Sequence, residues 1–249
     1  MAGNQVAAGE ERGMMANSEW VESWALGNTG FHFDKHDPYL DEHEEEIFGD
    51  EPKNVFVPLC GKSKDMIWMH GRGHTVVGVE IAEQPIRELF QEHDIPHQVL
   101  EVAGVGKLYK SNDERLLLYA ADIFDISESL VGKFNVIWDM KSIVAINVAD
   151  RIKYRDLLLS VLYRDGVYYV GALEFDSSVW AGPPHTMDRK AIEDLFPECL
   201  VELIDEMNVT GRTLSTLKSE EKMVEFNDAG LALKSSPYLY ARTYKMKFK

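Results

Sequence analysis

A glycine-containing turn followed by a carboxylate is the pattern in this chain that best fits ligand chemistry. Residues 55–59 form a short apolar run typical of a parallel strand buried on both faces. Gly61 lies in the turn that follows, and residues 74–80 read as a second strand ending on Glu80. Glu80 comes 19 residues after Gly61. That is about the spacing at which a βαβ unit places an acid to accept hydrogen bonds from a ribose diol.

The turn lacks the glycine pattern of a dinucleotide site, because Gly61 is its only glycine. A pyrophosphate needs several close backbone N–H groups at the start of a helix. The turn therefore favours a nucleoside without phosphates, of which S-adenosylmethionine is the common example, over a nicotinamide cofactor. On spacing alone, an ordinary βαβ unit with a solvated Glu80 remains an alternative.

The elements that position these residues alternate between strands and helices. Further strands are predicted at residues 116–119, 134–139 and 167–173, with helical segments between them. Two long strands, at 201–209 and 238–248, follow at the end. The pattern predicts an α/β, Rossmann-like fold. We expect a seven-stranded mixed sheet with helices on both faces, its last two strands forming an antiparallel ending.

Polar and aromatic residues follow several of these strands. Asp122 comes just after the third strand, Asp139 and Met140 end the fourth, and Trp180 and Pro183 lie in a proline-stiffened loop after the fifth. Because the carboxyl ends of parallel strands meet at one edge of the sheet, we expect these residues at the ligand-binding edge. Asp122 fits an acceptor for an adenine amino group, and it equally fits a turn or helix-cap aspartate.

The N-terminal region carries two tryptophans, Trp20 and Trp24, four residues apart on one face of a predicted helix. They fit a lid over a pocket as well as they fit an ordinary core. We expect residues 1–17 to be a flexible tail and residues 18–249 to form a single domain, in which 18–51 is a lid-like segment.

Charge and composition exclude several classes of function. The chain has a net charge of −16, and residues 1–51 contribute −11 of it through 13 acids and 2 bases. Binding to nucleic acid needs a basic face, so we expect no such partner. No apolar run is long enough for a membrane helix. The acidic run at 41–46 is interpreted as a solvated face, and we predict no metal site. Two cysteines suit a reducing, cytoplasmic location.

Several motifs give the chain a specific resemblance. The segment Val57-Pro58-Leu59-Cys60-Gly61-Lys62, with the strand that ends on Glu80, resembles the signature of the thiopurine S-methyltransferase family. Further matches cover about residues 18 to 200 in order: Ile123-Phe124-Asp125, Ile137-Trp138-Asp139, Val144-Ala145-Ile146-Asn147, Asp150-Arg151 and Gly182-Pro183-Pro184.

The resemblance implies S-adenosylmethionine as cofactor and assigns roles to these positions. Glu80 would hold the ribose hydroxyls, Asp122 and Ile123 would flank the adenine, and Trp20 would cover the cofactor. The full cofactor set that we predict is Trp20, Trp24, Phe31, Leu59, Gly61, Glu80, Asp122, Ile123, Asp139 and Met140. The substrate set that we predict is Phe31, Met140, Trp180 and Pro183.

The chain departs from the family at one position that matters. Met140 stands where the family typically has an arginine, and methionine offers neither charge nor a hydrogen-bond donor. The resemblance implies a monomeric enzyme that methylates a small heterocyclic thiol. The same fold acting on another soft nucleophile, or a non-catalytic S-adenosylmethionine-binding protein, remain alternatives. An acidic heteroaryl thiol needs no general base, so we predict none; His32 and His185 are the residues to test if one exists.

Overall fold

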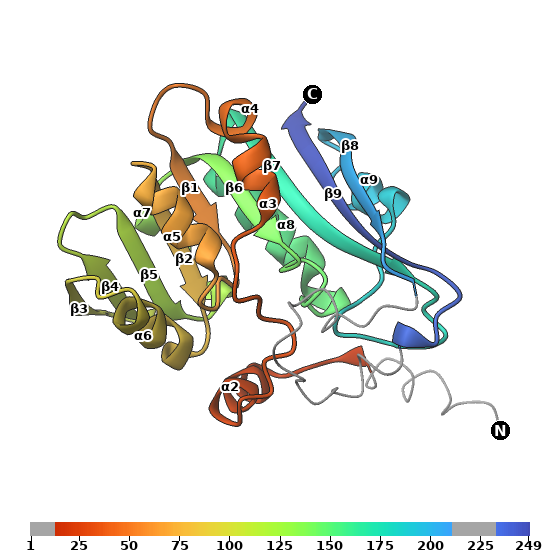
Figure 1. Cartoon of the computed structure of the whole chain (residues 1–249), viewed down its shortest axis with the longest axis horizontal. Coiled ribbons are helices and arrows are strands. Elements are labelled where there is room, and N and C mark those ends of the chain that lie inside the picture. The colour runs from red at the N-terminus through yellow and green to blue at the C-terminus, as the bar shows by residue number, and fades with distance from the viewer. Residues whose placement is uncertain (1–12, 211–232) are drawn as a thin grey trace.

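The computed structural model describes residues 13–210 and 233–249 of the chain, so most of the predicted N-terminal tail lies outside the described residues. A nine-stranded sheet runs through this part of the chain, in the order β3-β4-β5-β2-β1-β6-β7-β9-β8 (Figure 1). The five central strands, from β5 to β7, pair in parallel. These five are β1 (Asn54–Val57), β2 (Thr75–Glu80), β5 (Leu116–Ala121), β6 (Phe134–Met140) and β7 (Leu162–Phe175).

The predicted fold class is confirmed, but the predicted strand number is too low. All seven expected strands are present, and β8 (Cys199–Asn208) and β9 (Leu239–Phe248) form the antiparallel ending. The two additional strands are β3 (His97–Val102) and β4 (Gly106–Ser111), an antiparallel hairpin that extends the sheet beyond β5. Most of β3 is exposed, so it lacks the clean apolar alternation by which a half-buried strand is recognised.

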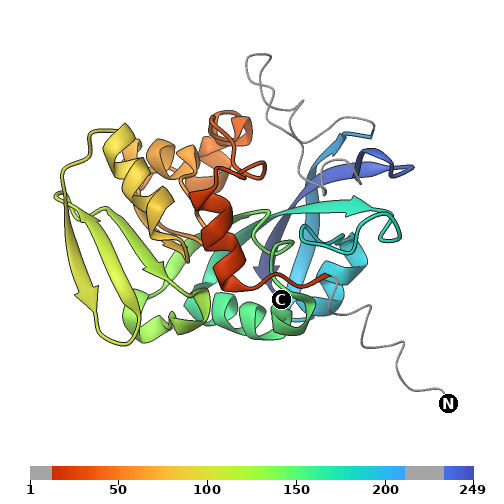
Figure 2. The same ribbon diagram turned by 90° about the horizontal axis from the view of Figure 1, so that it is seen from below.

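Helices cover both faces of the sheet, as predicted (Figure 2). The hydrophobic core is accordingly in two layers. On one face, Met66, Ile86 and Phe48 pack against the strands, and on the other Leu158 and Phe196 do so. The first face carries α3 (Pro38–Glu42), α4 (Glu44–Phe48), α5 (Lys64–Gly71) and α6 (Glu83–Glu92); the second carries α7 (Glu128–Val131), α8 (Arg151–Val161) and α9 (Arg189–Leu195).

The segment 18–51 contains two parts that differ in burial. The first is α2 (Asn17–Ala25), in which only Trp24 is buried. The second contains α3 and α4, where Leu40 and Phe48 are 0% and 1% exposed and belong to the core of the sheet. The second part is therefore packed as firmly as the domain itself, and only the first has the character of a cover.

Candidate functional site

The turn after β1 is held in an unusual backbone conformation. Leu59 and Gly61 both have left-handed backbones, with φ of 44° and 49°. A left-handed leucine costs free energy, and such residues cluster at binding sites. The Cys60 N–H donates to the Val79 carbonyl (2.9 Å), and the Gly61 N–H donates to Glu80 Oε2 (3.0 Å). The turn is thus fastened directly to the end of β2.

Glu80 is a buried carboxylate with no cationic partner among the described residues. Its side chain is buried and accepts two backbone N–H groups, from Gly61 and, at 2.9 Å, from Ala82. Burial raises the pKa of Glu80 to about 7, although these backbone hydrogen bonds lower it. Each carboxylate oxygen can accept a second hydrogen bond, so Glu80 retains the capacity to bind two hydroxyl groups.

An aromatic cluster from the N-terminal segment packs on this turn. A Cβ atom placed on Gly61 would lie 2.9 Å from Trp24 Cζ2, so the indole sits directly against the glycine. Phe31 meets both Trp20 and Trp24 edge-on, with ring centroids 5.5 Å apart in each pair. The structure therefore brings Trp20, Trp24 and Phe31 together over Gly61, beside Glu80.

Asp122 lies at the end of β5 and reaches the same N-terminal segment. Its Oδ1 accepts the Phe124 N–H (2.9 Å), which caps the short 3₁₀ helix Ile123–Asp125. Its Oδ2 accepts a hydrogen bond from Asn17 Nδ2 (2.6 Å), the first residue of α2. Ile123 is 7% exposed. Asp122 is thus a cap, one of the two readings that its spacing allowed, and it also anchors the start of α2.

Asp139 has no hydrogen-bonding capacity left for a ligand. Its side chain is fully buried. Oδ1 accepts the N–H groups of Ser142 (2.8 Å) and Ile143 (3.1 Å), and Oδ2 accepts the hydroxyls of Tyr154 (2.8 Å) and Tyr168 (2.7 Å). These four bonds fill the acceptor positions of a carboxylate. We therefore leave the Asp139 side chain out of the cofactor site, where the sequence had suggested it.

Met140 and Lys141 continue the chain at the end of β6. The Met140 sulfur would lie 3.2 Å from a Cβ on Gly171, so the side chain packs over β7. Lys141 has a left-handed backbone, with φ of 76°, and its ammonium lies 4.6 Å from the centroid of the Phe33 ring. Burial lowers the pKa of Lys141, with Asp37 and Asp65 opposing the shift. The apolar Met140 is therefore followed directly by the Lys141 cation, which lies over the Phe33 ring.

The loop after β7 carries Trp180, Pro183 and His185. The Trp180 indole N–H donates to the Pro183 carbonyl (3.0 Å), which ties the two predicted substrate residues to one another. The His185 N–H donates to the Val144 carbonyl (2.7 Å), which joins this loop to the segment that follows β6. Of the predicted substrate residues, Met140 therefore ends β6, and Trp180 and Pro183 lie in the loop after β7.

Two polar groups near this loop lie outside the predicted cofactor and substrate sets, although His185 was named as a base to test. Arg151 begins α8, and its Nε and Nη2 atoms are buried without a hydrogen-bond partner. The His185 Nε2 atom is buried and unpartnered as well. The sequence motifs include Asp150-Arg151 only as part of the resemblance, and no sequence signal shows that these side chains lack partners.

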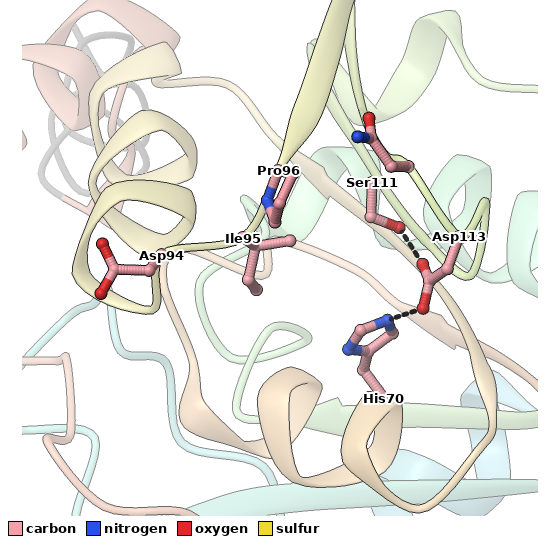
Figure 3. A pocket seen from close by; sticks show the side chains of 7 residues that line it. His70, Asp94, Ile95, Pro96, Ser111 and Asp113 are labelled. Atoms are coloured by element: carbon pink, nitrogen blue, oxygen red, sulfur yellow. Dashed lines mark hydrogen bonds and ion pairs between the residues drawn. The ribbon is translucent and has the colours of Figure 1, made fainter.

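A pocket also lies at the opposite edge of the sheet, lined by His70, Ser111 and Asp113 (Figure 3). His70 Nε2 and Ser111 Oγ both bond to the Asp113 carboxylate, at 2.9 Å and 2.5 Å. A serine nucleophile would need its hydroxyl on the histidine. This cluster is therefore an internal network that closes the β4–β5 turn.

Neither a metal centre nor a membrane span is evident in the part of the chain that the structure describes. No group of three histidine, cysteine, aspartate or glutamate side chains in residues 13–210 and 233–249 could hold a metal ion. Over the same residues, no helix combines the length and apolar character that crossing a bilayer requires.

Solved structures share the fold of this chain at low sequence identity. A geranyl diphosphate C-methyltransferase from Streptomyces coelicolor, solved with S-adenosyl-L-homocysteine, superposes with a TM-score of 0.60 over 94% of this chain and 97% of its own, at 11% identity. A didemethyltoxoflavin N1-methyltransferase from Burkholderia thailandensis, solved with S-adenosylhomocysteine, gives a TM-score of 0.56 over 93% and 87%, at 15% identity. These likenesses establish a methyltransferase-like fold.

Sequence relatives are much closer. Thiopurine S-methyltransferase of Canis lupus familiaris is 37% identical over 77% of this chain and 80% of its own length. The probable thiopurine S-methyltransferase of Danio rerio is 37% identical over 78% and 86%. The model of the thiopurine S-methyltransferase family matches residues 15–228. The chain therefore belongs to the thiopurine S-methyltransferase family.

Proposed function

We propose that this protein is an enzyme that transfers the methyl group of S-adenosylmethionine to the sulfur atom of a small aromatic or heterocyclic thiol. The observation that carries the proposal is the buried Glu80 carboxylate, which is bonded to the left-handed Gly61 turn beneath the tryptophans of α2. Family membership supports the reaction class.

The residues present suit a nucleoside cofactor. Glu80 offers acceptor positions for two ribose hydroxyls. Leu59 and Gly61 belong to the turn against which the cofactor would lie. Ile123 supplies an apolar surface and Asp122 a polar one at the neighbouring strand end, where adenine would bind. When bound, S-adenosylmethionine would supply an electrophilic methyl group on a sulfonium sulfur. Trp20, Trp24, Phe31 and Met140 complete the proposed cofactor site.

The contribution of the chain to the reaction would be exclusion of water and orientation. The bound cofactor would supply the methyl group to a lone pair of the acceptor thiolate and would keep the electron pair of the broken bond. Opposite charges disappear in this step, so a dry site favours it. The cover made by Trp20, Trp24 and Phe31 would exclude water, and Phe31, Met140, Trp180 and Pro183 would orient the acceptor.

Met140 supports a second candidate, a methyltransferase of the same fold that acts on another soft nucleophile. An arginine at this position would bring a charge to the end of β6, whereas Met140 packs its sulfur over Gly171. A neutral, polarizable wall suits an uncharged or poorly hydrated acceptor, such as an aliphatic thiol, a halide, thiocyanate, or a selenium or tellurium compound.

The first experiment is methyl transfer from labelled S-adenosylmethionine to 6-mercaptopurine by the purified protein. Transfer is the expected result and would show that Met140 does not abolish activity on a thiopurine. Binding of S-adenosylhomocysteine without transfer would favour the second candidate, to be followed by a panel of thiols, halides and selenium compounds and by Met140→Arg. Failure of S-adenosylhomocysteine to raise the melting temperature would contradict both candidates and the non-catalytic alternative.

We further propose a cytoplasmic monomer acting on a small molecule. Support for the compartment comes from the two cysteines, Cys60 and Cys199, which are free and buried. Size-exclusion chromatography with light scattering tests the oligomeric state.

A further inference from the structure

The Arg151 side chain is half-buried, and no carboxylate among the described residues pairs with its guanidinium. Its Nε and Nη2 atoms are buried and make no hydrogen bond. Burial lowers the pKa of Arg151, and no carboxylate among the described residues opposes that shift. In a chain with 42 acids and 26 bases, a carboxylate would be easy to supply. Two buried guanidinium donors without a partner are costly, and an anion from outside the chain would satisfy them.

Arg155 shows what a paired arginine looks like on the same helix. It lies one turn after Arg151 in α8. Its guanidinium donates to the Asp156 carboxylate (2.5 Å) and the Leu195 carbonyl (3.2 Å), and lies 3.5 Å from a Glu198 oxygen. Two arginines of the same helix therefore differ in their pairing, so the lack of partners at Arg151 comes from its position in the fold.

His185 adds an unpartnered acceptor beside this cation. The side chain is 5% exposed, and Nδ1 lies 3.0 Å from the Ala181 carbonyl oxygen. Because a carbonyl oxygen only accepts, Nδ1 carries the proton of the neutral ring, and the buried Nε2 is left with a free lone pair. Burial lowers the pKa of His185, and the charge of Arg151 lowers it further.

The two residues lie at the ligand-binding edge, on the side where β6 and β7 end. His185 is joined through its backbone to Val144, which follows β6. Arg151 comes seven residues after Val144, behind Asn147, whose side chain bonds to both the N–H and the carbonyl of Met15 (3.0 Å and 3.1 Å). Met15 leads into α2, the helix that covers the Gly61 turn. The pair therefore stands beside the proposed cofactor site, within the segments proposed for the acceptor.

We propose that Arg151 and His185 form the recognition subsite for the methyl acceptor. The proposal rests on the proposed function. Arg151 Nε and Nη2 donate to an anionic atom of the acceptor, and His185 Nε2 accepts a hydrogen bond from a neighbouring N–H or O–H group. The subsite selects an acidic thiol whose ring also carries a hydrogen-bond donor. The cation that Met140 does not provide is thus supplied by another element.

Steady-state kinetics with two acceptors tests this assignment. The first acceptor is 6-mercaptopurine, which carries a ring N–H, and the second is 4-nitrothiophenol, an acidic thiol without one. For Arg151→Gln we expect KM to rise about 10- to 100-fold for both acceptors, the range for a lost hydrogen bond to a charged group. For His185→Phe we expect a rise for 6-mercaptopurine only. Arg155→Gln is the matched control and should keep the wild-type KM values.

Binding of S-adenosylhomocysteine by calorimetry separates the subsite from the cofactor site. Arg151→Gln should bind it with wild-type affinity. Weakened binding, with unchanged KM for both acceptors, would overturn the assignment and point to the carboxylate of the cofactor as the anion. Unchanged KM and unchanged cofactor affinity would overturn it too. If Arg151→Gln does not fold, Arg151→Lys, which keeps the charge but loses the paired donors, should show a smaller rise in KM.

A failure of the proposed function would be recognised separately, because the wild-type protein would then methylate neither acceptor. In that case, calorimetric titration of 4-nitrothiophenol into the wild-type complex with S-adenosylhomocysteine tests the subsite directly. Binding that Arg151→Gln abolishes would support the subsite, and absence of binding to the wild-type complex would overturn it.

Discussion

Both edges of the central sheet carry clustered ionisable side chains. The hydrogen-bonding capacity of these side chains is filled within the protein at one edge and left partly open at the other. At the edge of His70 and Ser111, the Asp113 carboxylate accepts from both of these side chains and from the Arg115 backbone and guanidinium. At the ligand-binding edge, Glu80 is bonded only to backbone N–H groups, and Arg151 and His185 keep buried atoms unpartnered.

The pKa shifts of the two carboxylates express the same contrast. Burial raises the pKa of Glu80 to about 7, whereas the hydrogen bonds and charges around Asp113 hold its pKa far below the ordinary range, although burial opposes this. A network that closes on itself stabilises the fold. Buried polar groups left open beside the Gly61 turn can instead bind a ligand, and this is how the two edges differ.

The largest effect is expected for Glu80→Gln. The substitution removes the charge from two proposed hydrogen bonds to the ribose, and a hydrogen bond to a charged group contributes about 1.5–3 kcal/mol. We expect the affinity for S-adenosylhomocysteine to fall about 100-fold or more, measured by calorimetry at pH 8. The control is Glu88→Gln, whose carboxylate pairs with the Lys62 side chain and not with the Gly61 backbone. Equal affinity in Glu80→Gln and the wild type would refute the ribose contact.

Acidification should weaken cofactor binding through the same carboxylate. Ribose hydroxyls donate to the ionised form of Glu80, so affinity should be full above its pKa of about 7. Below that pH, affinity should fall by up to about tenfold per pH unit. Calorimetry with S-adenosylhomocysteine between pH 8 and pH 6 measures this dependence. Glu80→Gln should show a flat profile over this range, and a slope that persists in the variant would assign the titration to another group.

A smaller effect is expected for Gly61→Ala. The new methyl group would press on Trp24 and would sit on a backbone with φ of 49°. If about 1 kcal/mol of this strain is relieved by displacing the aromatic cover, the affinity for S-adenosylhomocysteine falls about fivefold. Gly73→Ala is the matched control, because its φ is 94° and nothing lies within 4 Å of its new Cβ. Both variants should lose thermal stability, and only Gly61→Ala should lose affinity.

The smallest effect on function is expected at the opposite edge. Asp113→Asn should leave methyl transfer and cofactor affinity unchanged, while the free energy of unfolding falls by about 1 kcal/mol, because the group is partly exposed and its ion pairs are screened. The lowered pKa places this stabilisation above the pKa of the unfolded chain, and it is lost as the pH falls through the folded pKa. Loss of activity at full stability would mean that this pocket, too, takes part in function.

The sequence could predict the site where the signal was local. The apolar run before Gly61 and the carboxylate at the end of the next strand lie within one βαβ unit, and the structure joins them by a hydrogen bond. Asp139 shows the limit of such reasoning. Its place at a strand end suggested a ligand, but its partners Tyr154 and Tyr168 lie 15 and 29 residues further along the chain. Only the folded structure shows that they occupy its carboxylate.

Two other features could not be predicted from the sequence, each for a physical reason. The β3–β4 hairpin extends the edge of the sheet, and Val99 and Leu100 remain 48% and 41% exposed, so burial imposes little pattern on its sequence. The unpartnered state of Arg151 is a property of its surroundings, and no motif encodes the lack of a carboxylate near a given side chain. The sequence shows which polar residues are present, but it does not show whether each of them has a hydrogen-bond partner in the folded protein.

The division of the N-terminal segment has a consequence for how this protein could be dissected. Leu40 and Phe48 are integral to the core, while α2 touches the domain mainly through Trp24, Asn17 and their neighbours. A chain shortened to begin at about residue 34 should keep its sheet and lose its aromatic cover. One that begins at residue 52 should lose part of its core. Within this segment, the stretch with α3 and α4 is needed for folding, and the stretch with α2 for cofactor affinity. A truncation that removes only α2 should therefore lower the affinity and leave the fold intact.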